Sequence, residues 1–175
     1  MHIPQWPCSL ILSTTLLCLA PLSAFASPNP HDIILRLASE TFAPQIANQL
    51  QFLTPKGWNL RTDGNDLSFH VPYHPGILGH IIQNNALSPD EFLKDLEKTY
   101  HAEFSEISRS EAKNDHLQGN KLLLNGQFGG ETYTILLFTG KLDAQMDIAF
   151  YAIAPSHWFQ SYEPLFLDIL NSLHK

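Results

Sequence analysis

The chain has 175 residues, with 10 basic and 17 acidic side chains, so its net charge is −7 at neutral pH. This acidity argues against nucleic acid and anionic membrane surfaces as partners, because both carry the same sign of charge. The sequence has no internal repeat and no run of like charges. A single domain is the simplest organisation for a chain of this length.

The first 26 residues have the pattern of a cleavable secretory signal. The segment from Leu10 to Leu22 is almost wholly apolar and is too short to span a bilayer. Ala24-Phe25-Ala26 supplies the small-x-small pattern that signal peptidase requires, although Met1 to Pro7 contains no Lys or Arg. We therefore expect cleavage after Ala26 and a periplasmic or secreted domain over residues 27–175. An uncleaved amphipathic or buried helix is the alternative.

Both cysteines, Cys8 and Cys18, lie inside this signal. Cys18 is preceded by Thr15-Leu16-Leu17, which lacks the small residue expected before an acylated cysteine, so lipidation is the less favoured alternative. The mature domain then has no disulfide, thiol nucleophile or cysteine metal site. Its core of packed side chains must hold it together in an oxidising compartment.

The first half of the mature chain mixes helical and strand-like patterns. Apolar residues recur at helical spacing from Asp32 to Leu50, and Pro44 predicts a break, so we expect a helix followed by a short second piece. Leu67 to Val71 alternates as a half-buried strand does, after a turn at residues 63–66. The clearest helix start is Ser88-Pro89-Asp90-Glu91, which has the residues of a capping box and a proline suited to the first helical turn.

Beyond this helix the apolar period changes to two. Ser105 to Ser110 is typical of an edge strand, and three further strands are predicted over Lys121 to Phe128, Glu131 to Thr139 and Gln145 to Ala154. Their short connections require antiparallel pairing. The last strand is apolar on both faces, so we expect it at the centre of the sheet.

The chain ends in an amphipathic segment from Ser156 to Leu173, where Pro164 predicts a first turn followed by the main helix. Helices before and after a run of antiparallel strands predict an α+β fold, with a central, mostly antiparallel β-sheet flanked by helices on both faces.

Two local patterns resemble those of PsbP-like domains. Phe52 to Trp58 contains the Pro-x-Gly-Trp sequence that follows a short strand in those domains, and the strand from Ile148 to Ala154 runs into a similar aromatic, amphipathic helix. The resemblance covers Leu50 to the end of the chain and does not extend to the helical stretch before it. It implies the α/β/α sandwich of a superfamily that includes the photosystem extrinsic protein, a Ran-binding import factor and DcrB-like lipoproteins. It also implies binding or assembly roles, without a shared catalytic centre.

Aromatic and proline residues in predicted loops are the candidate binding site. We expect Trp58, Tyr73, His74 and Pro75 to form a contact surface with the loop from Pro72 to His80, because loops often carry binding function. For Trp58 itself, a position that closes one end of the core is the favoured interpretation.

His70, His74 and His80 lie at a strand end and in this loop, where they could converge on zinc or copper. No fixed ligand spacing is present, and Pro72 and Pro75 prevent a regular helical presentation, so exposed or hydrogen-bonded histidines are favoured. We therefore expect neither a metal nor a cofactor.

No catalytic motif emerges from the sequence. It contains no Gly-x-Ser-x-Gly elbow of a serine hydrolase. The glycine-rich segment Gly126 to Gly130 could be a phosphate-binding loop, but no Lys-Ser or Lys-Thr follows it and strands are predicted on both sides, so we expect a hairpin. Two pairs of carboxylates, Asp143 with Asp147 and Glu103 with Glu106, could serve as the catalytic pair of a glycosidase. Such spacings occur wherever charged residues line a surface, so this function is not favoured.

The sequence therefore predicts a non-catalytic exported protein that binds another envelope or secreted protein, or a small ligand, and has no membrane span after signal cleavage. A metal-dependent enzyme using the loop histidines and a secreted effector acting on host targets are the alternatives.

Overall fold

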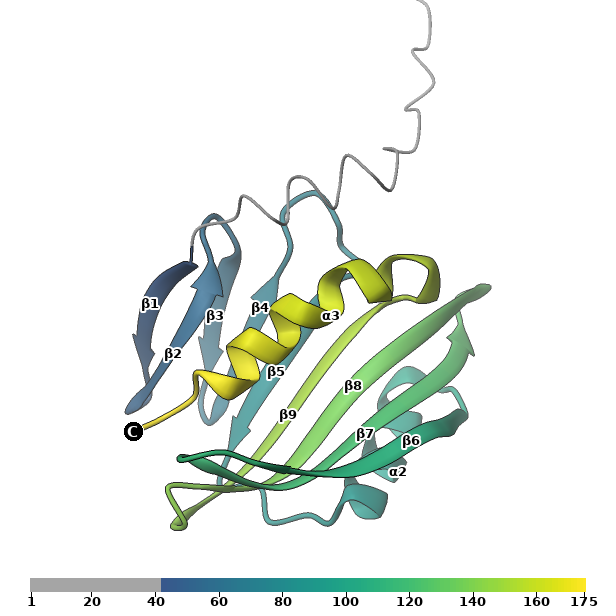
Figure 1. The fold of residues 1–175 in the computed structure, drawn as a ribbon. Helices are drawn as coiled ribbons and strands as arrows, with labels where there is room; N and C mark the ends of the chain where they lie inside the picture. The colour runs from purple at the N-terminus through teal and green to yellow at the C-terminus, as the bar shows by residue number, and fades with distance from the viewer. Residues whose placement is uncertain (1–41) are drawn as a thin grey trace, which may run out of the picture.

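A computed structural model describes residues 42–175, which form a seven-stranded sheet, a two-stranded sheet and two helices (Figure 1). The expected signal, its cleavage site and both cysteines lie outside the described residues. The elements in chain order are β1 (Phe42–Ala47), β2 (Leu50–Pro55), β3 (Asn59–Asp63), β4 (Asp66–His70), β5 (Leu78–Gln83), α2 (Pro89–Tyr100), β6 (Phe104–Lys113), β7 (Leu117–Phe128), β8 (Glu131–Leu142), β9 (Met146–Pro155) and α3 (Ser156–Asn171).

The large sheet has the strand order β3-β4-β5-β9-β8-β7-β6, and every neighbouring pair is antiparallel. The predicted central strand is confirmed, because β9 lies in the middle of this order and is buried from Ile148 to Pro155. The predicted edge strand is also confirmed, because β6 lies at one end and is mostly exposed.

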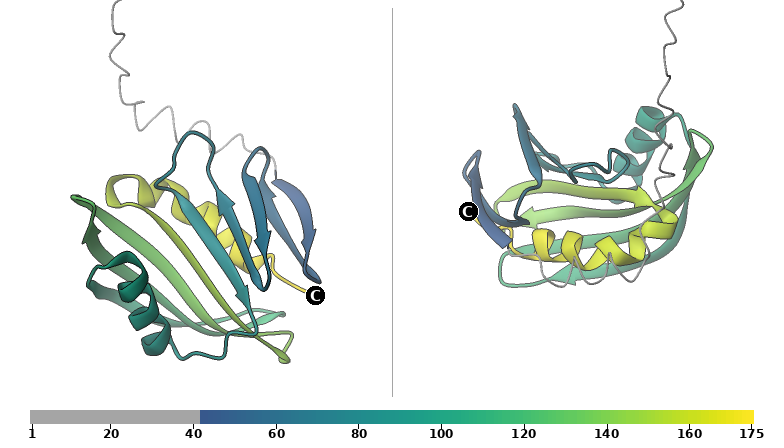
Figure 2. Two further views of the ribbon diagram at one scale, coloured as in Figure 1. Left: turned by 180° about the vertical axis from the view of Figure 1, so that it is seen from behind. Right: turned by 90° about the horizontal axis from the view of Figure 1, so that it is seen from above.

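The two helices cover opposite faces of this sheet (Figure 2). Alternate residues of β9 point to the two faces: Phe150 packs into the core beneath α3, whereas Tyr151 packs into the core beneath α2. Each core is apolar, so burial of both sheet faces stabilises the sandwich. The α+β fold with helices on both faces is confirmed.

The start of α2 is the capping box that the sequence predicts. The Ser88 hydroxyl accepts from the backbone N–H of Glu91 at 3.4 Å, and the Glu91 carboxylate accepts from the backbone N–H of Ser88 at 2.9 Å. The Ser88 hydroxyl also donates to the Glu91 carboxylate at 2.7 Å, and this bond, together with the one from the Ser88 backbone N–H, holds the pKa of Glu91 below its usual value. The hairpin expected at Gly126–Gly130 is likewise present, with Gly129 and Gly130 at φ values of 60° and 82° between β7 and β8.

The prediction of a helix from Asp32 to Leu50 is wrong for residues 42–50, the part of this range that the structure describes. Residues 42–55 form the β1–β2 hairpin, whose turn places Asn48 and Gln49 at positive φ. The hairpin depends on distant residues: Leu50 and Phe52 pack into the core beneath α3, and Gln51 pairs with His174 in an isolated bridge. Tertiary contacts therefore override the local helical spacing.

Three smaller expectations also need correction. Strand β3 was not predicted, and Leu78 to His80, expected in a loop, begins strand β5. Gly79 suits this strand because the Phe69 ring lies over it, leaving no room for a β-carbon. Helix α3 is continuous through Pro164, whose exposed position lets solvent satisfy the backbone carbonyl that a proline leaves unbonded.

Candidate functional site

Trp58 packs against the core. Its ring stacks on Phe69, with centroids 5.8 Å apart and planes at 28°, and lies 6.2 Å from the ring of Phe166 in α3. Its third aromatic neighbour is Tyr162, at 6.3 Å. Trp58 therefore packs at the edge of the core, the role that the sequence favoured for it.

The loop from Val71 to Ile77 is closed by three backbone hydrogen bonds. The N–H of His74 donates to the carbonyl of Val71 at 3.2 Å, Ile77 donates to His74 at 2.9 Å, and Val71 donates to Ile77 at 3.2 Å. Tyr73, at the tip, has φ 64° and a side chain that is 99% exposed. A bulky residue in the left-handed region is uncommon, so this loop holds its tyrosine outward at a conformational cost.

His74 fixes the loop to the start of α3. Its imidazole lies 6.3 Å from the ring of Trp158 at 61° and 6.5 Å from the ring of Tyr162 at 60°. Tyr162 also contacts Trp58, so Trp58 and His74, both predicted as binding residues, contact the same side chain of α3. Trp158 and Tyr162 are members of this site that the sequence analysis missed.

The other side of the loop rests on the central strands. Pro75 is exposed, whereas a β-carbon at the neighbouring Gly76 would lie 3.4 Å from the Tyr133 hydroxyl and 3.6 Å from Pro155. We define the apical surface as the loop Val71–Ile77, the first turn of α3 (residues 156–159) and the tip of the β7–β8 hairpin (residues 128–131). Contacts of His74 with Trp158 and of His157 with Glu131 join these segments, which lie along the upper right of Figure 1.

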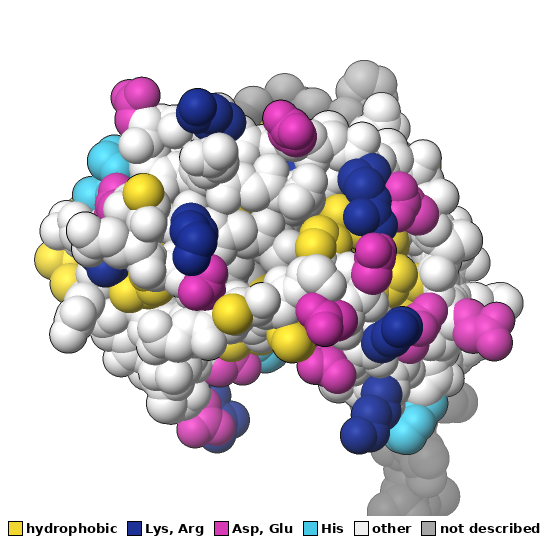
Figure 3. Space-filling view, turned by 90° about the horizontal axis from the view of Figure 1, so that it is seen from below, with side chains coloured by type: hydrophobic (Ala, Val, Ile, Leu, Met, Phe, Trp, Pro, Cys, Tyr) yellow, Lys and Arg dark blue, Asp and Glu magenta, His cyan; other side chains and the backbone are white. Residues whose placement is uncertain are grey.

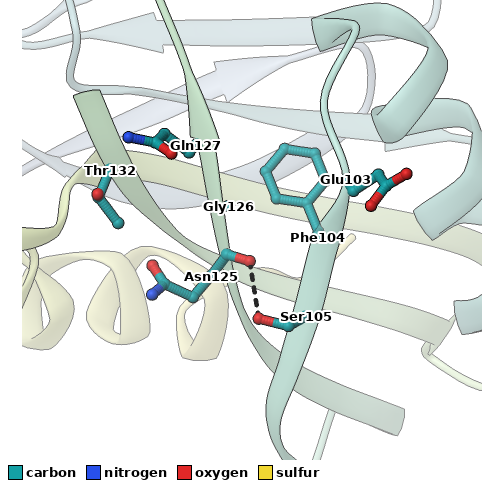
Figure 4. A pocket seen from close by; sticks show the side chains of 7 residues that line it. All are labelled: Glu103, Phe104, Ser105, Asn125, Gly126, Gln127 and Thr132. Carbon is teal, nitrogen blue, oxygen red and sulfur yellow. Dashed lines mark hydrogen bonds between the residues drawn. The ribbon is translucent and has the colours of Figure 1, made fainter. Parts of the chain in front are cut away.

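A shallow cleft of about 400 Å³ adjoins this surface, between the start of β6 and the β7–β8 hairpin (Figure 4). Within it, the Ser105 hydroxyl donates to the backbone carbonyl of Asn125 at 3.2 Å. The side chains around it are mainly polar, from Glu103, Ser105, Asn125, Gln127 and Thr132, together with Phe104 and Gly126.

Asn125 joins this cleft to the first residue of α3. Its side-chain oxygen accepts from the Ser156 hydroxyl at 3.1 Å and from Thr134 at 3.5 Å, and the two hydroxyls lie 2.9 Å apart. No side chain caps the N-terminus of α3, so this network is what ties its first residue to β7 and β8.

Charged groups border the hairpin side of the apical surface. His157 lies 3.7 Å from the Glu131 carboxylate, and the same carboxylate accepts from the Tyr133 hydroxyl at 3.3 Å. Partial burial, with the nearby charge of Glu131, raises the pKa of Tyr133.

The three histidines considered for metal binding are not brought together. His70 and His80 lie on β4 and β5 and face the α2 side of the sheet, whereas His74 packs against α3 on the opposite side. Burial, with the charges of His80 and Arg61, lowers the pKa of His70. Within residues 42–175, no group of three or more His, Cys, Asp or Glu side chains is arranged to hold a metal ion.

The two carboxylate pairs are engaged with basic partners. Asp143 is bonded to His116 at 2.8 Å, which lowers the pKa of that carboxyl, and Asp147 accepts from Lys141 at 2.8 Å. Glu106 accepts from Arg109 at 2.8 Å, which leaves Glu103 at the cleft. Neither pair therefore presents two free carboxyl groups to a common space.

No family model and no curated protein sequence matches the chain. Solved structures do match it. Cyanobacterial PsbP (CyanoP) from Synechocystis sp. PCC 6803 has a TM-score of 0.56 at 14% identity, over 77% of this chain and 92% of that one. The Ran-binding protein Mog1p of Saccharomyces cerevisiae has a TM-score of 0.56 at 7% identity, over 78% of this chain and 96% of that one.

The chain therefore has the PsbP-like fold that CyanoP and Mog1p share. This confirms the architecture implied by the Pro-x-Gly-Trp sequence and by the final strand and helix. Identities this low establish the PsbP-like fold alone, so the residues of the site are argued from this chain. Neither helix within residues 42–175 is long and apolar enough to cross a bilayer.

Proposed function

We propose that this chain is an exported, non-catalytic protein that binds another envelope or secreted protein through the apical surface, with Tyr73 as its central contact. The observation that carries the proposal is the state of Tyr73, which combines 99% exposure with φ 64°. Both features are unfavourable in the free protein, because the ring buries no apolar area and the backbone is strained. A partner that covers the ring offsets both.

The loop is preorganised for such a contact. Three internal hydrogen bonds and the packing of His74 against Trp158 fix its backbone, so binding requires little further ordering. A fixed backbone and an aromatic side chain with few rotatable bonds lower the entropic cost of association. Tyrosine is also among the residues most often found to dominate binding energy at interfaces.

The surroundings of Tyr73 suit the rim of a protein interface. Glu131 and His157 supply polar and charged side chains at the hairpin side of the apical surface, and the adjoining cleft is lined mainly by polar groups. An apolar or aromatic centre with a polar rim is the usual anatomy of a non-obligate interface.

Export is supported by the apolar segment before Ala26 and by the small-x-small pattern of Ala24-Phe25-Ala26. Protein binding has a precedent on this fold, since Mog1p is a Ran-binding protein, although fold analogy says nothing about the partner's identity.

The test is crosslinking in the native cell. A photoreactive amino acid placed at position 73 should form one dominant adduct, identified by mass spectrometry, in the periplasmic or culture-medium fraction. Placement at Ile46, an apolar side chain that is 78% exposed on β1, is the matched control and should give no such adduct. Equal labelling from both positions, or a protein that stays in the cytoplasm with its first 26 residues intact, would overturn the proposal.

A further inference from the structure

Two histidines meet at the end of the molecule opposite the apical surface. His116 precedes β7 in the β6–β7 turn, and His174 lies in the tail after α3. Their ring centroids are 5.4 Å apart, with planes at 36°. The space-filling view from this end shows histidine side chains gathered at one margin, beside acidic side chains (Figure 3).

Each ring is anchored through the same nitrogen. Nδ1 of His116 lies 2.8 Å from a carboxylate oxygen of Asp143, and Nδ1 of His174 lies 2.8 Å from the backbone carbonyl of Ser172. A carbonyl and an ionised carboxylate only accept, so the proton of each neutral ring sits on Nδ1. The Nε2 lone pairs have no hydrogen-bond partner among the described residues.

This is the arrangement that metal-ligating histidines adopt. Their second ring nitrogen usually donates to a carboxylate or a backbone carbonyl, which orients the ring and makes the ligating nitrogen more basic. Here Asp143 and Ser172 provide one partner of each kind. Asp143 is itself held by the backbone N–H of Lys175 at 3.0 Å, so the carboxylate that orients His116 is fixed in place.

The separation of the rings also fits a shared cation. With an Nε2–metal distance of about 2.0–2.1 Å, each ring centroid lies roughly 3.2 Å from the metal, so two imidazoles at a tetrahedral angle have centroids about 5.2 Å apart. The 5.4 Å between His116 and His174 matches this spacing. By contrast, His70 and His80 make no ring contact with each other among the described residues.

We propose that His116 and His174 form a two-histidine site for a divalent transition-metal cation, Cu²⁺ or Zn²⁺, with water completing the coordination shell. Imidazole suits both ions, and Cu²⁺ binds more tightly than Zn²⁺ to a given set of nitrogen ligands. This site is separate from the three loop histidines considered from the sequence.

The bound cation fastens the end of the chain. His174 exchanges backbone hydrogen bonds with Gln51 of β2 at 2.8 and 3.0 Å, while His116 and Asp143 belong to the β6–β7 and β8–β9 turns. A cation shared by the two rings therefore links the tail to turns of the large sheet. Because the unfolded chain does not hold the two rings together, the cation stabilises the folded state by mass action.

The test is calorimetric titration of tag-free protein with CuSO₄ and with ZnCl₂ in a non-chelating buffer. We expect one equivalent of each ion to bind, Cu²⁺ more tightly. His116→Ala and His174→Ala should each weaken binding at least tenfold, and the double variant should lose little more, because one site needs both rings. His101→Ala, at an exposed histidine that ends α2, is the control and should bind as the wild type does.

Two further measurements separate the site from non-specific binding. The electron paramagnetic resonance spectrum of the Cu²⁺ complex should show two coordinating imidazole nitrogens, and ZnCl₂ should raise the Tm of the wild type but not of the double variant. Circular dichroism verifies that the variants fold. Absence of stoichiometric binding, a spectrum with one nitrogen, or equal loss from His101→Ala would overturn the proposal.

Discussion

The imidazole of His80 lies flat on the ring of Tyr151, with centroids 4.7 Å apart and planes only 8° apart. Nδ1 of His80 contacts both oxygens of the Asp66 carboxylate at 2.9 Å, and the Tyr151 hydroxyl lies 3.4 Å from that of Tyr100 in α2. This row of polar groups joins β4, β5, β9 and α2 at the border of the α2-side core. Because the Tyr151 hydroxyl is buried in this row, the stability of the fold depends on that hydroxyl remaining protonated.

We expect Tyr151→Phe to reduce the loss of stability at high pH. Burial, with the neighbouring Tyr100 hydroxyl, raises the pKa of Tyr151 well above its usual value. A folded-state pKa above the unfolded value of about 10 gives a contribution that is complete below pH 10 and lost as the pH rises above it. Urea unfolding at several pH values between 8 and 11 should therefore show a steeper decline for the wild type. Parallel curves for the two proteins would contradict this account.

Ser88→Ala should destabilise the protein by about 1 kcal/mol, because it removes the hydroxyl that caps α2. Chemical denaturation measures the change. Ser110→Ala, at an exposed position of edge strand β6, is the matched control and should shift the free energy of unfolding by less than about 0.5 kcal/mol. An equal effect from both variants would mean that the cap contributes nothing specific.

Gly140→Ala should be more damaging than an ordinary surface substitution. Gly140 pairs with Gly119 across β8 and β7, and a β-carbon at Gly140 would clash with the Gln118 carbonyl oxygen and lie 2.6 Å from the Gly119 α-carbon. Backbone must move to admit the methyl group, at a cost of roughly 1–3 kcal/mol. Gly76→Ala, whose nearest neighbour would be 3.4 Å away, is the control that should lower Tm much less.

Local signals explain what the sequence could predict. The capping box at Ser88, the apolar run of β9 and the glycines of the β7–β8 turn act within a few residues, so their patterns are visible in the chain itself. The β1–β2 hairpin is different, because Leu50 and Phe52 need the core beneath α3 and Gln51 needs His174. The helical spacing of apolar residues up to Leu50 gives no information about those distant partners, so the prediction from it was wrong.

The candidate site shows the same limit. Tyr73 and His74 could be singled out because aromatic side chains in a proline-containing loop are unusual. The placement of His74 beside Trp158 and Tyr162 depends on how β9 leads into α3 at this end of the sheet, which no local pattern encodes. The pairing of His116 with His174 likewise arises only when the tail docks on β2.

Tyr73→Gly should raise the stability of the free protein by about 1 kcal/mol, because glycine adopts positive φ without the steric cost that tyrosine bears. The ring makes no contribution to the core that this change would remove, since it is 99% exposed. Thermal unfolding of the two proteins gives the difference directly. A marked fall in Tm would show that the ring stabilises the fold after all.

The most direct test of the binding account is the Kd of the crosslinked partner for the wild type and for Tyr73→Gly, measured on proteins whose Tm values are also compared. We expect the variant to be at least as stable yet to bind about 30-fold more weakly, the loss typical of an aromatic side chain that dominates an interface. An unchanged Kd in a stable variant would contradict the central role of Tyr73 and, with it, the proposed function of the apical surface.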